Sequence, residues 1–138
     1  VRVDAVGCGV MTPTTDLANA RLEFASGCVA NLNASRVSLV PKREIRLFQP
    51  AGYLSLNFAE QRGHMITKSG LPLPGKLGLK KQAVPIEKGE ALRIELASFA
   101  DAVRRRTDPK VDATLGTTAL DVALEIIGKI EERQATAK

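Results

Sequence analysis

Two runs of alternating apolar and polar residues, separated by a short turn, constrain the fold of this chain more than any other feature. Residues 18–24 and 28–37 each alternate, and the turn between them contains Gly27, which can adopt the positive φ of a three-residue hairpin loop. Pairing Phe24 with Cys28 sets the register of the two strands. The sequence therefore predicts an antiparallel β-hairpin.

This register gives the hairpin two unlike faces. Leu22 falls opposite Ala30 on an apolar face, whereas Asn19 falls opposite Asn33 on a polar face. We expect the apolar face to form part of the core and the polar face to remain outside it.

A second hairpin is predicted by the same alternation, between residues 44–49 and residues 53–58. One of its faces is aliphatic, and the other carries Phe48 and Tyr53, which makes it more apolar than ordinary solvent exposure favours. Such a face often binds a partner. We expect the chain to form a homodimer or homotetramer through this sheet face.

The last third of the chain changes from a period of two to a helical period. A first helix is expected over residues 90–106, and Thr114 is expected to cap a second helix. The apolar stripe of the first helix comprises Leu92, Leu96, Phe99 and Val103. The stripe of the second comprises Leu120, Ala123, Ile127 and Ile130.

Further strands at residues 1–6, 64–68 and 82–86 complete the predicted fold. The class is α+β, with an open, largely antiparallel sheet of about six strands and two C-terminal amphipathic helices on one face. The length of 138 residues suits a single domain, residues 1–138. No apolar run approaches the roughly 18 residues of a membrane span, and no secretory signal is present, so we expect a cytoplasmic protein without a membrane partner.

The net charge of +5 comes from one stretch, residues 61–86, which contains no acidic residue. Its basic residues are Arg62, Lys68, Lys76, Lys80 and Lys81. Prolines and glycines within it predict a basic loop between Arg62 and Lys81. This loop is either a solvated connector or a flap for an anionic substrate or a neighbouring subunit. Nucleic acid is not an expected partner, because the loop has no aromatic residues on which bases could stack.

Several motifs imitate functional sites without completing them. Gly7-Cys8-Gly9 follows a predicted strand, as in a dinucleotide-binding fingerprint, but Thr12 stands where the third glycine is needed and no helix opens there. Cys8 and Cys28 have no nearby group that would favour a thiolate, which predicts small buried side chains. His64 is a lone histidine with no carboxylate placed to orient it. We therefore predict no catalytic, cofactor-binding or metal-binding residues in this chain.

Three blocks of sequence, in a fixed order, are similar to a known pattern. They are Asn19-Ala20-Arg21-Leu22-Glu23-Phe24, Gly27-Cys28-Val29-Ala30-Asn31 and Ala34-Ser35-Arg36. In this order they resemble the C-terminal domain of the glucose-fructose oxidoreductase, inositol dehydrogenase and MocA family, here called the Gfo/Idh/MocA family. The resemblance continues through residues 42–48, 52–56, 90–106 and 120–130 and covers nearly the whole chain.

Within the family, the resemblance is to the bacterial branch that oxidises carbon 3 of the sugar in UDP-N-acetylglucosamine. It implies a two-domain enzyme in which an N-terminal Rossmann domain, absent from this chain, binds NAD or NADP. The Glu-Lys-Pro motif and the catalytic histidine of the family would both lie upstream of Val1. Because the chain begins with Val1 and with a strand-like pattern, we expect it to be a piece of a longer protein. Its implied role is to bind a sugar or UDP-sugar and to build the oligomer interface.

Four polar residues are the candidates for binding that substrate: Asn33, Ser35, Arg36 and Lys42. A sugar nucleotide carries diphosphate charge and several hydroxyl groups, so cations and hydrogen-bonding side chains are its expected partners. Each candidate also has a structural explanation. Asn33 can simply occupy a polar sheet face, and Arg36 falls opposite Asp16, where the two can form an ion pair.

A different class of function also fits the sequence. The chain can be a free-standing module that self-associates through its aromatic sheet face, while the basic loop binds an acidic partner.

Overall fold

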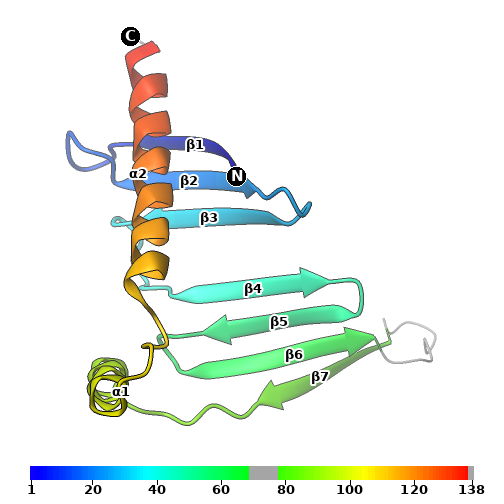
Figure 1. Cartoon of the computed structure of the whole chain (residues 1–138). Helices are drawn as coiled ribbons and strands as arrows, with labels where there is room; N and C mark the ends of the chain where they lie inside the picture. Colours follow the sequence, from blue (N-terminus) through cyan, green and yellow to red (C-terminus); the bar gives the residue numbers. More distant parts are fainter. Residues whose placement is uncertain (69–77, 137–138) are drawn as a thin grey trace. The chain divides into compact units, whose positions relative to one another are not determined.

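The computed structural model describes residues 1–68 and 78–136. These residues fall into two compact units, the first formed by Val1–Leu39 with Leu96–Lys138 and the second by Val40–Glu95. The first unit contains a three-stranded sheet and the long helix α2, and the second contains a four-stranded sheet (Figure 1).

The sheet of the first unit is antiparallel in the order β1 (Arg2–Cys8), β2 (Leu17–Glu23), β3 (Val29–Ser35). The hairpin register is the predicted one, with Leu22 opposite Ala30. The amide of Phe24 donates to the carbonyl of Cys28 at 2.9 Å, and Gly27 takes a φ of 83° in the turn. The first predicted hairpin is confirmed.

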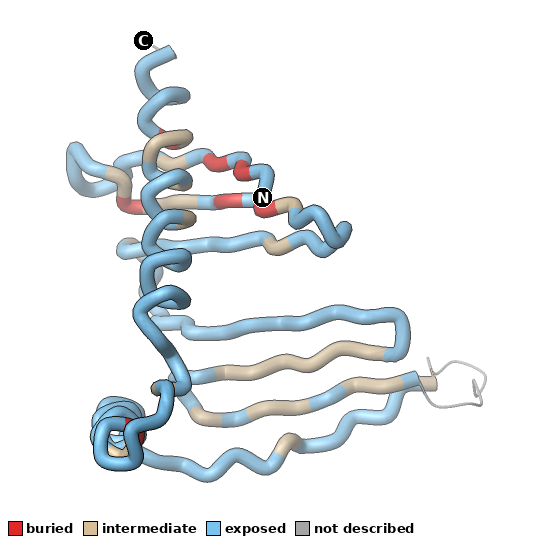
Figure 2. The backbone as a smooth tube through the Cα atoms, in the orientation of Figure 1, coloured by how far each residue is buried: buried red, intermediate tan, exposed pale blue. Residues whose placement is uncertain are grey.

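The core of the first unit lies where helix α2 (Ala113–Thr136) packs against this sheet. Ile130 is buried against Ala5 and Ala20, and most of the buried positions in Figure 2 lie in β1, β2 and α2, the others being Asp16 and Ala102. Gly7 allows this contact, because a Cβ at that position would lie 3.0 Å from Ile130 and 2.8 Å from Thr15. One large aliphatic side chain therefore fixes the helix on a surface of small residues.

The second unit is an antiparallel sheet in the order β4, β5, β6, β7. Its strands are β4 (Glu44–Gln49), β5 (Gly52–Asn57), β6 (Arg62–Lys68) and β7 (Leu79–Val84). Leu47 lies opposite Leu54, as expected for the second hairpin. None of the described residues of this unit is buried (Figure 2).

The predicted class is confirmed: the structure is α+β, its sheets are open and antiparallel, and two helices follow them. The strands form two sheets, however, where we expected one of about six strands. β3 and β4 are not hydrogen-bonded neighbours, and residues 36–43 between them contain no strand. Alternation predicts strands and local hairpins, but it carries little information about which strands pair beyond a short turn.

The two helices differ in detail from their predicted patterns. Asp112 caps α2, because its Oδ1 accepts a hydrogen bond from the amide of Leu115 at 2.8 Å, whereas Thr114 lies inside the first turn. The side of α2 that faces the sheet carries Ile126 and Ile130, while Ile127 of the predicted stripe is half exposed. Residues spaced by three or by four lie on the same face of a helix, so the apolar residues of this segment fit more than one helix face and the sequence leaves the phase ambiguous.

Helix α1 (Ala91–Arg105) ends where Arg106 takes a φ of 54° and the amide of Thr107 donates to the carbonyl of Ala102. Its predicted apolar stripe is more than half exposed, and Ala102 is instead its buried residue. The expectation that both helices cover one sheet face therefore holds for α2 alone. Neither helix is long and apolar enough to cross a membrane, within the ranges that the structure describes.

Two further expectations are corrected. Cys8 and Cys28 are exposed free thiols, not buried side chains, because Cys8 is the last residue of β1 and Cys28 lies in the turn before β3. The stretch that we expected to form a basic loop begins with β6 and ends with β7, which contains Lys80 and Lys81. Lys76 and the proline-rich part of that loop lie outside the described residues.

Candidate functional site

The connection between β1 and β2 is folded around the carboxylate of Asp16. Its Oδ2 accepts hydrogen bonds from the amides of Val10 at 3.0 Å, Met11 at 2.8 Å and Thr12 at 2.8 Å. Its Oδ1 accepts from the Thr12 hydroxyl at 2.9 Å. The residue is only 4% exposed. A buried carboxylate thus satisfies three backbone donors that would otherwise lack partners in this loop.

These bonds favour the charged form of Asp16. The amides of Val10, Met11 and Thr12 hold its pKa well below the usual range for an aspartate, and desolvation opposes them only in part. Asp16 is therefore an anion in the folded chain at any ordinary pH.

Arg36 completes this cluster from the end of β3. Its Nη2 lies 3.2 Å from Asp16 Oδ1 and donates to Thr14 Oγ1 at 3.0 Å and to the carbonyl of Thr15 at 2.7 Å. The backbone also pairs here, since the Arg36 amide donates to the Asp16 carbonyl at 2.9 Å. The ion pair expected from the hairpin register is confirmed.

The side chain of Arg36 is 63% exposed although one of its nitrogens is bound. Its Nε and Nη1 have no hydrogen-bond partner among residues 1–68 and 78–136. The guanidinium therefore combines a fixed inner nitrogen with outer donors that an anion or a hydroxyl group can reach.

The other predicted binding residues do not join this cluster. Asn33 and Ser35 are exposed on the sheet face opposite the one that packs against Ile130. The hydroxyl of Ser35 accepts a hydrogen bond from the amide of Val37 at 3.2 Å. Lys42 is exposed and belongs to the second unit. The structure thus brings Arg36 together with Asp16, Thr12 and Thr14, which we had not predicted as site residues.

A sequence signal for the Asp16 cluster does exist. Asp16 follows a segment rich in glycine and threonine and directly precedes a strand. Aspartates in such positions commonly accept hydrogen bonds from the amides of the adjoining turn.

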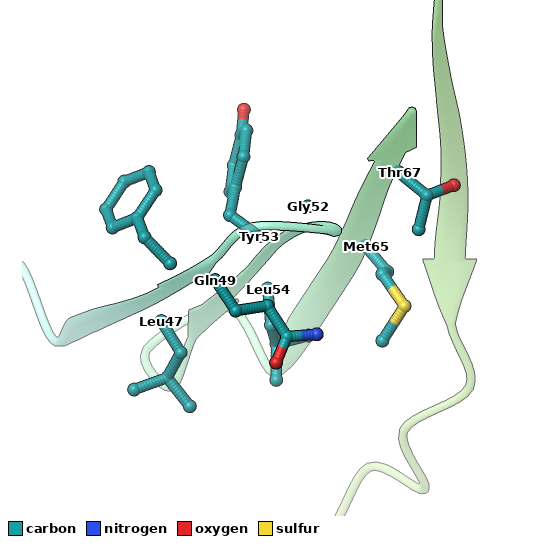
Figure 3. Close-up of a pocket in the computed structure, with 8 residues that line it drawn as sticks. Leu47, Gln49, Gly52, Tyr53, Leu54, Met65 and Thr67 are labelled. Atoms are coloured by element: carbon teal, nitrogen blue, oxygen red, sulfur yellow. The ribbon is translucent and has the colours of Figure 1, made fainter. Parts of the chain in front are cut away.

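A second feature is a hollow of about 260 Å³ at the turn between β4 and β5. Its lining includes Leu47, Gln49, Leu54 and Met65, whose side chains point to one side of the sheet, whereas the Tyr53 ring points to the other side (Figure 3). The lining offers aliphatic contact and no paired acid and base, so the hollow suits packing better than chemistry.

The face that carries Tyr53 is aromatic. The ring centroids of Phe48 and Tyr53 lie 5.1 Å apart, and Tyr53 meets His64 edge to face at 6.4 Å. Phe48 is 72% exposed. No group of three His, Cys, Asp or Glu side chains within the described ranges could hold a metal ion.

We compared the sequence and the structure of the chain with those of known proteins. No protein-family model matches the chain. Two crystal structures of one enzyme share the fold over 96% of the chain, with TM-scores of 0.87 and 0.83 and sequence identities of 32% and 30%. The resemblance of the sequence blocks to the C-terminal domain of the Gfo/Idh/MocA family is therefore confirmed.

Both crystal forms, P21 and P212121, are of UDP-N-acetylglucosamine 3-dehydrogenase GnnA from Acidithiobacillus ferrooxidans. The sequence of that dehydrogenase is 33% identical over 131 residues, which are 95% of this chain and 42% of the relative. The chain thus spans less than half of the length of the proteins that it matches.

Proposed function

We propose that this chain is the C-terminal substrate-binding and oligomerisation domain of an NAD(P)-dependent oxidoreductase that acts on a sugar or nucleotide sugar. The observation that carries this proposal is the match of 95% of the chain to 42% of a UDP-N-acetylglucosamine 3-dehydrogenase. A UDP-sugar is accordingly the substrate we infer, and oxidation of a sugar CH–OH group is the reaction of the whole protein.

The proposed reaction divides between two domains. Hydride transfer requires a nicotinamide held against the sugar carbon and a base that takes the hydroxyl proton. We assign both, with the NAD or NADP site, to a Rossmann domain outside this chain. This chain contributes binding groups, of which Arg36 is the strongest because its guanidinium is fixed at one nitrogen and exposed at the others. Asn33, Ser35 and Lys42 remain weaker candidates for the hydroxyl and phosphate groups.

The large accessible area of the chain supports the proposal that it is a domain with binding partners. The accessible area of the chain is 11,705 Å². A compact monomer of its mass, 14.8 kDa, exposes about 7,000 Å², and two separate bodies of half that mass expose about 8,400 Å². The excess includes both faces of the four-stranded sheet, so we infer that one face meets the rest of the enzyme and the other meets a second copy.

Titration of the 138-residue chain tests the assignment of cofactor and substrate. We expect no heat of binding with NAD or NADP at millimolar concentration, and chemical-shift changes around Arg36 with UDP-N-acetylglucosamine. A one-to-one isotherm with either dinucleotide would contradict the proposal. Uridine is the control ligand, because it lacks the diphosphate that Arg36 is expected to bind.

The self-associating module remains a second candidate, favoured by the absence of any buried residue in the described part of the second unit. The coding sequence upstream of Val1 separates the two candidates. A strand with a GxGxxG turn and a Glu-Lys-Pro motif in frame supports the oxidoreductase, whereas a nearby start codon supports the module.

Self-association itself is tested by sedimentation equilibrium with a matched pair of variants. Phe48→Glu and Gln49→Glu each place one negative charge on β4, but on opposite faces of the sheet. We expect Phe48→Glu to reduce the species to 14.8 kDa, while the wild-type chain and Gln49→Glu remain larger. A wild-type chain that sediments only at 14.8 kDa would remove the oligomerisation role.

A further inference from the structure

We propose that Asp16 is a positioning residue, which fixes the Arg36 guanidinium in the orientation that receives an anionic substrate. The anchoring of Arg36 by Asp16 stands on geometry, and the ligand that Arg36 then binds rests on the proposed function.

The first step is that the Asp16 carboxylate has a fixed position of its own. Its Oδ2 is held by the amides of Val10, Met11 and Thr12 within 3.0 Å, and the residue is buried. These bonds involve only backbone donors of the β1–β2 connection. The carboxylate would therefore keep its place if the arginine were removed.

The second step is a closed ring of three hydrogen bonds and one ion-pair contact that joins the carboxylate to Arg36. Arg36 Nη2 donates to Thr14 Oγ1 at 3.0 Å, and Thr14 Oγ1 lies 3.0 Å from Thr12 Oγ1. Thr12 Oγ1 donates to Asp16 Oδ1 at 2.9 Å, which also lies 3.2 Å from Arg36 Nη2. If Thr14 donates to Thr12, each hydroxyl in the ring donates one hydrogen bond and accepts one.

The third step concerns the cost of binding a ligand. An exposed arginine has a large rotamer entropy, and a ligand must otherwise offset the loss of that entropy when it immobilises the side chain. Here the Thr15 carbonyl at 2.7 Å and the ring already restrict Arg36. Nε and Nη1 remain available to a phosphate, so part of the entropy is lost before the substrate arrives.

The charge balance is consistent with this role. Three backbone amides stabilise the Asp16 anion through its Oδ2. Only one nitrogen of Arg36, Nη2, approaches the carboxylate, at 3.2 Å from Oδ1. The arginine is thus anchored at one point and is not engaged in a two-point ion pair that would occupy a whole edge of the guanidinium.

The variants that test the proposal are Asp16→Asn, Arg36→Gln and the double variant, all in the 138-residue chain. The asparagine side chain of Asp16→Asn retains one oxygen for the loop amides and turns an NH2 group toward Arg36, so it removes the anchor with little change of shape. The control is Asp4→Asn, which breaks the Asp4–Arg133 pair of 2.6 Å in the same unit and leaves Arg36 untouched.

The first measurement needs no ligand. Nitrogen NMR of the guanidinium groups distinguishes a held arginine, with separate Nη1 and Nη2 signals, from a freely rotating one, in which they average. We expect separate Arg36 signals in the wild-type chain and in Asp4→Asn, and averaged signals in Asp16→Asn. Separate signals that persist in Asp16→Asn would overturn the proposal.

The second measurement is a double-mutant cycle of binding to UDP-N-acetylglucosamine, followed by chemical shifts. We expect Asp16→Asn and Arg36→Gln each to weaken binding about tenfold, and the double variant to bind no more weakly than Arg36→Gln alone. Additive losses would overturn the proposal. If the wild-type chain does not bind the nucleotide while the NMR result is as expected, the anchoring is supported and the substrate role proposed for Arg36 is rejected.

Discussion

Arg36 Nη2 lies 3.2 Å from Asp16 Oδ1, at the point where the end of β3 meets the start of β2. The two residues also share a backbone hydrogen bond of 2.9 Å, so the antiparallel ladder itself brings the charges together. The hairpin is therefore both the scaffold of the first unit and the support of its most organised polar cluster.

The first prediction concerns the stability of the chain at acidic pH. Because the amides of Val10, Met11 and Thr12 lower the pKa of Asp16, the folded chain keeps this carboxylate ionised at a pH where the unfolded chain has taken up a proton. Its contribution to stability is fully present above the unfolded pKa and is lost as the pH falls below it. Urea unfolding between about pH 6 and about pH 3 should therefore show a shallower loss of stability in Asp16→Asn than in the wild type.

Arg36→Gln is the control for that experiment. It leaves the carboxylate and its three amide donors in place, so the acid dependence should stay close to that of the wild type. An acid dependence in Arg36→Gln as shallow as that in Asp16→Asn would assign the effect to the ion pair instead of the loop amides.

The second prediction concerns the core. Ile130 is 3% exposed and packs against Ala5 and Ala20, so Ile130→Ala should lower the free energy of unfolding by about 2–5 kcal/mol. Ile127 lies three residues earlier on α2 and is 49% exposed, so Ile127→Ala should cost less than about 1 kcal/mol. Denaturant unfolding measures both, and equal losses would mean that α2 packs in another phase.

The third prediction uses two glycines. A Cβ at Gly7 would lie 2.8 Å from Thr15 and 3.0 Å from Ile130, so Gly7→Ala should cost about 1–3 kcal/mol. Gly128 lies in α2 with open space around it, so Gly128→Ala should stabilise the chain by up to about 1 kcal/mol. The midpoint temperature of thermal unfolding should fall in Gly7→Ala and rise in Gly128→Ala. An unchanged midpoint in Gly7→Ala would show that α2 can shift away from the added methyl group.

The fourth prediction concerns the start of α2. Asp112 Oδ1 accepts from the amide of Leu115 at 2.8 Å, so Asp112→Ala should cost about 0.5–2 kcal/mol. Thr114→Ala should change stability by no more than a few tenths of a kcal/mol, because that residue lies within the helix. Urea unfolding measures both variants. A larger loss of stability in Thr114→Ala than in Asp112→Ala would mean that Thr114 is the helix cap, as the sequence predicted.

The local elements of this chain were determined by sequence. Alternation and Gly27 predicted the first hairpin, and Leu22 pairs with Ala30 as that register requires. The same register placed Arg36 opposite Asp16, so the ion pair followed from pattern alone. These features depend on residues close in sequence, where turn geometry and side-chain period leave few alternatives.

Tertiary structure decided the division into two sheets and which face of α2 packs against the sheet of the first unit. Ile130 lies far along the sequence from Ala5, and only packing shows that Gly7 is small because Ile130 lies over it, not because it belongs to a nucleotide-binding motif. The position of Asp16 after a turn-rich segment indicates a bond to nearby amides, but only the closed loop decides that the donors are those of Val10, Met11 and Thr12. The hydrophobic pattern of a sequence indicates which side chains avoid water. It does not indicate which residues each of those side chains contacts, so only the folded structure reveals such contacts.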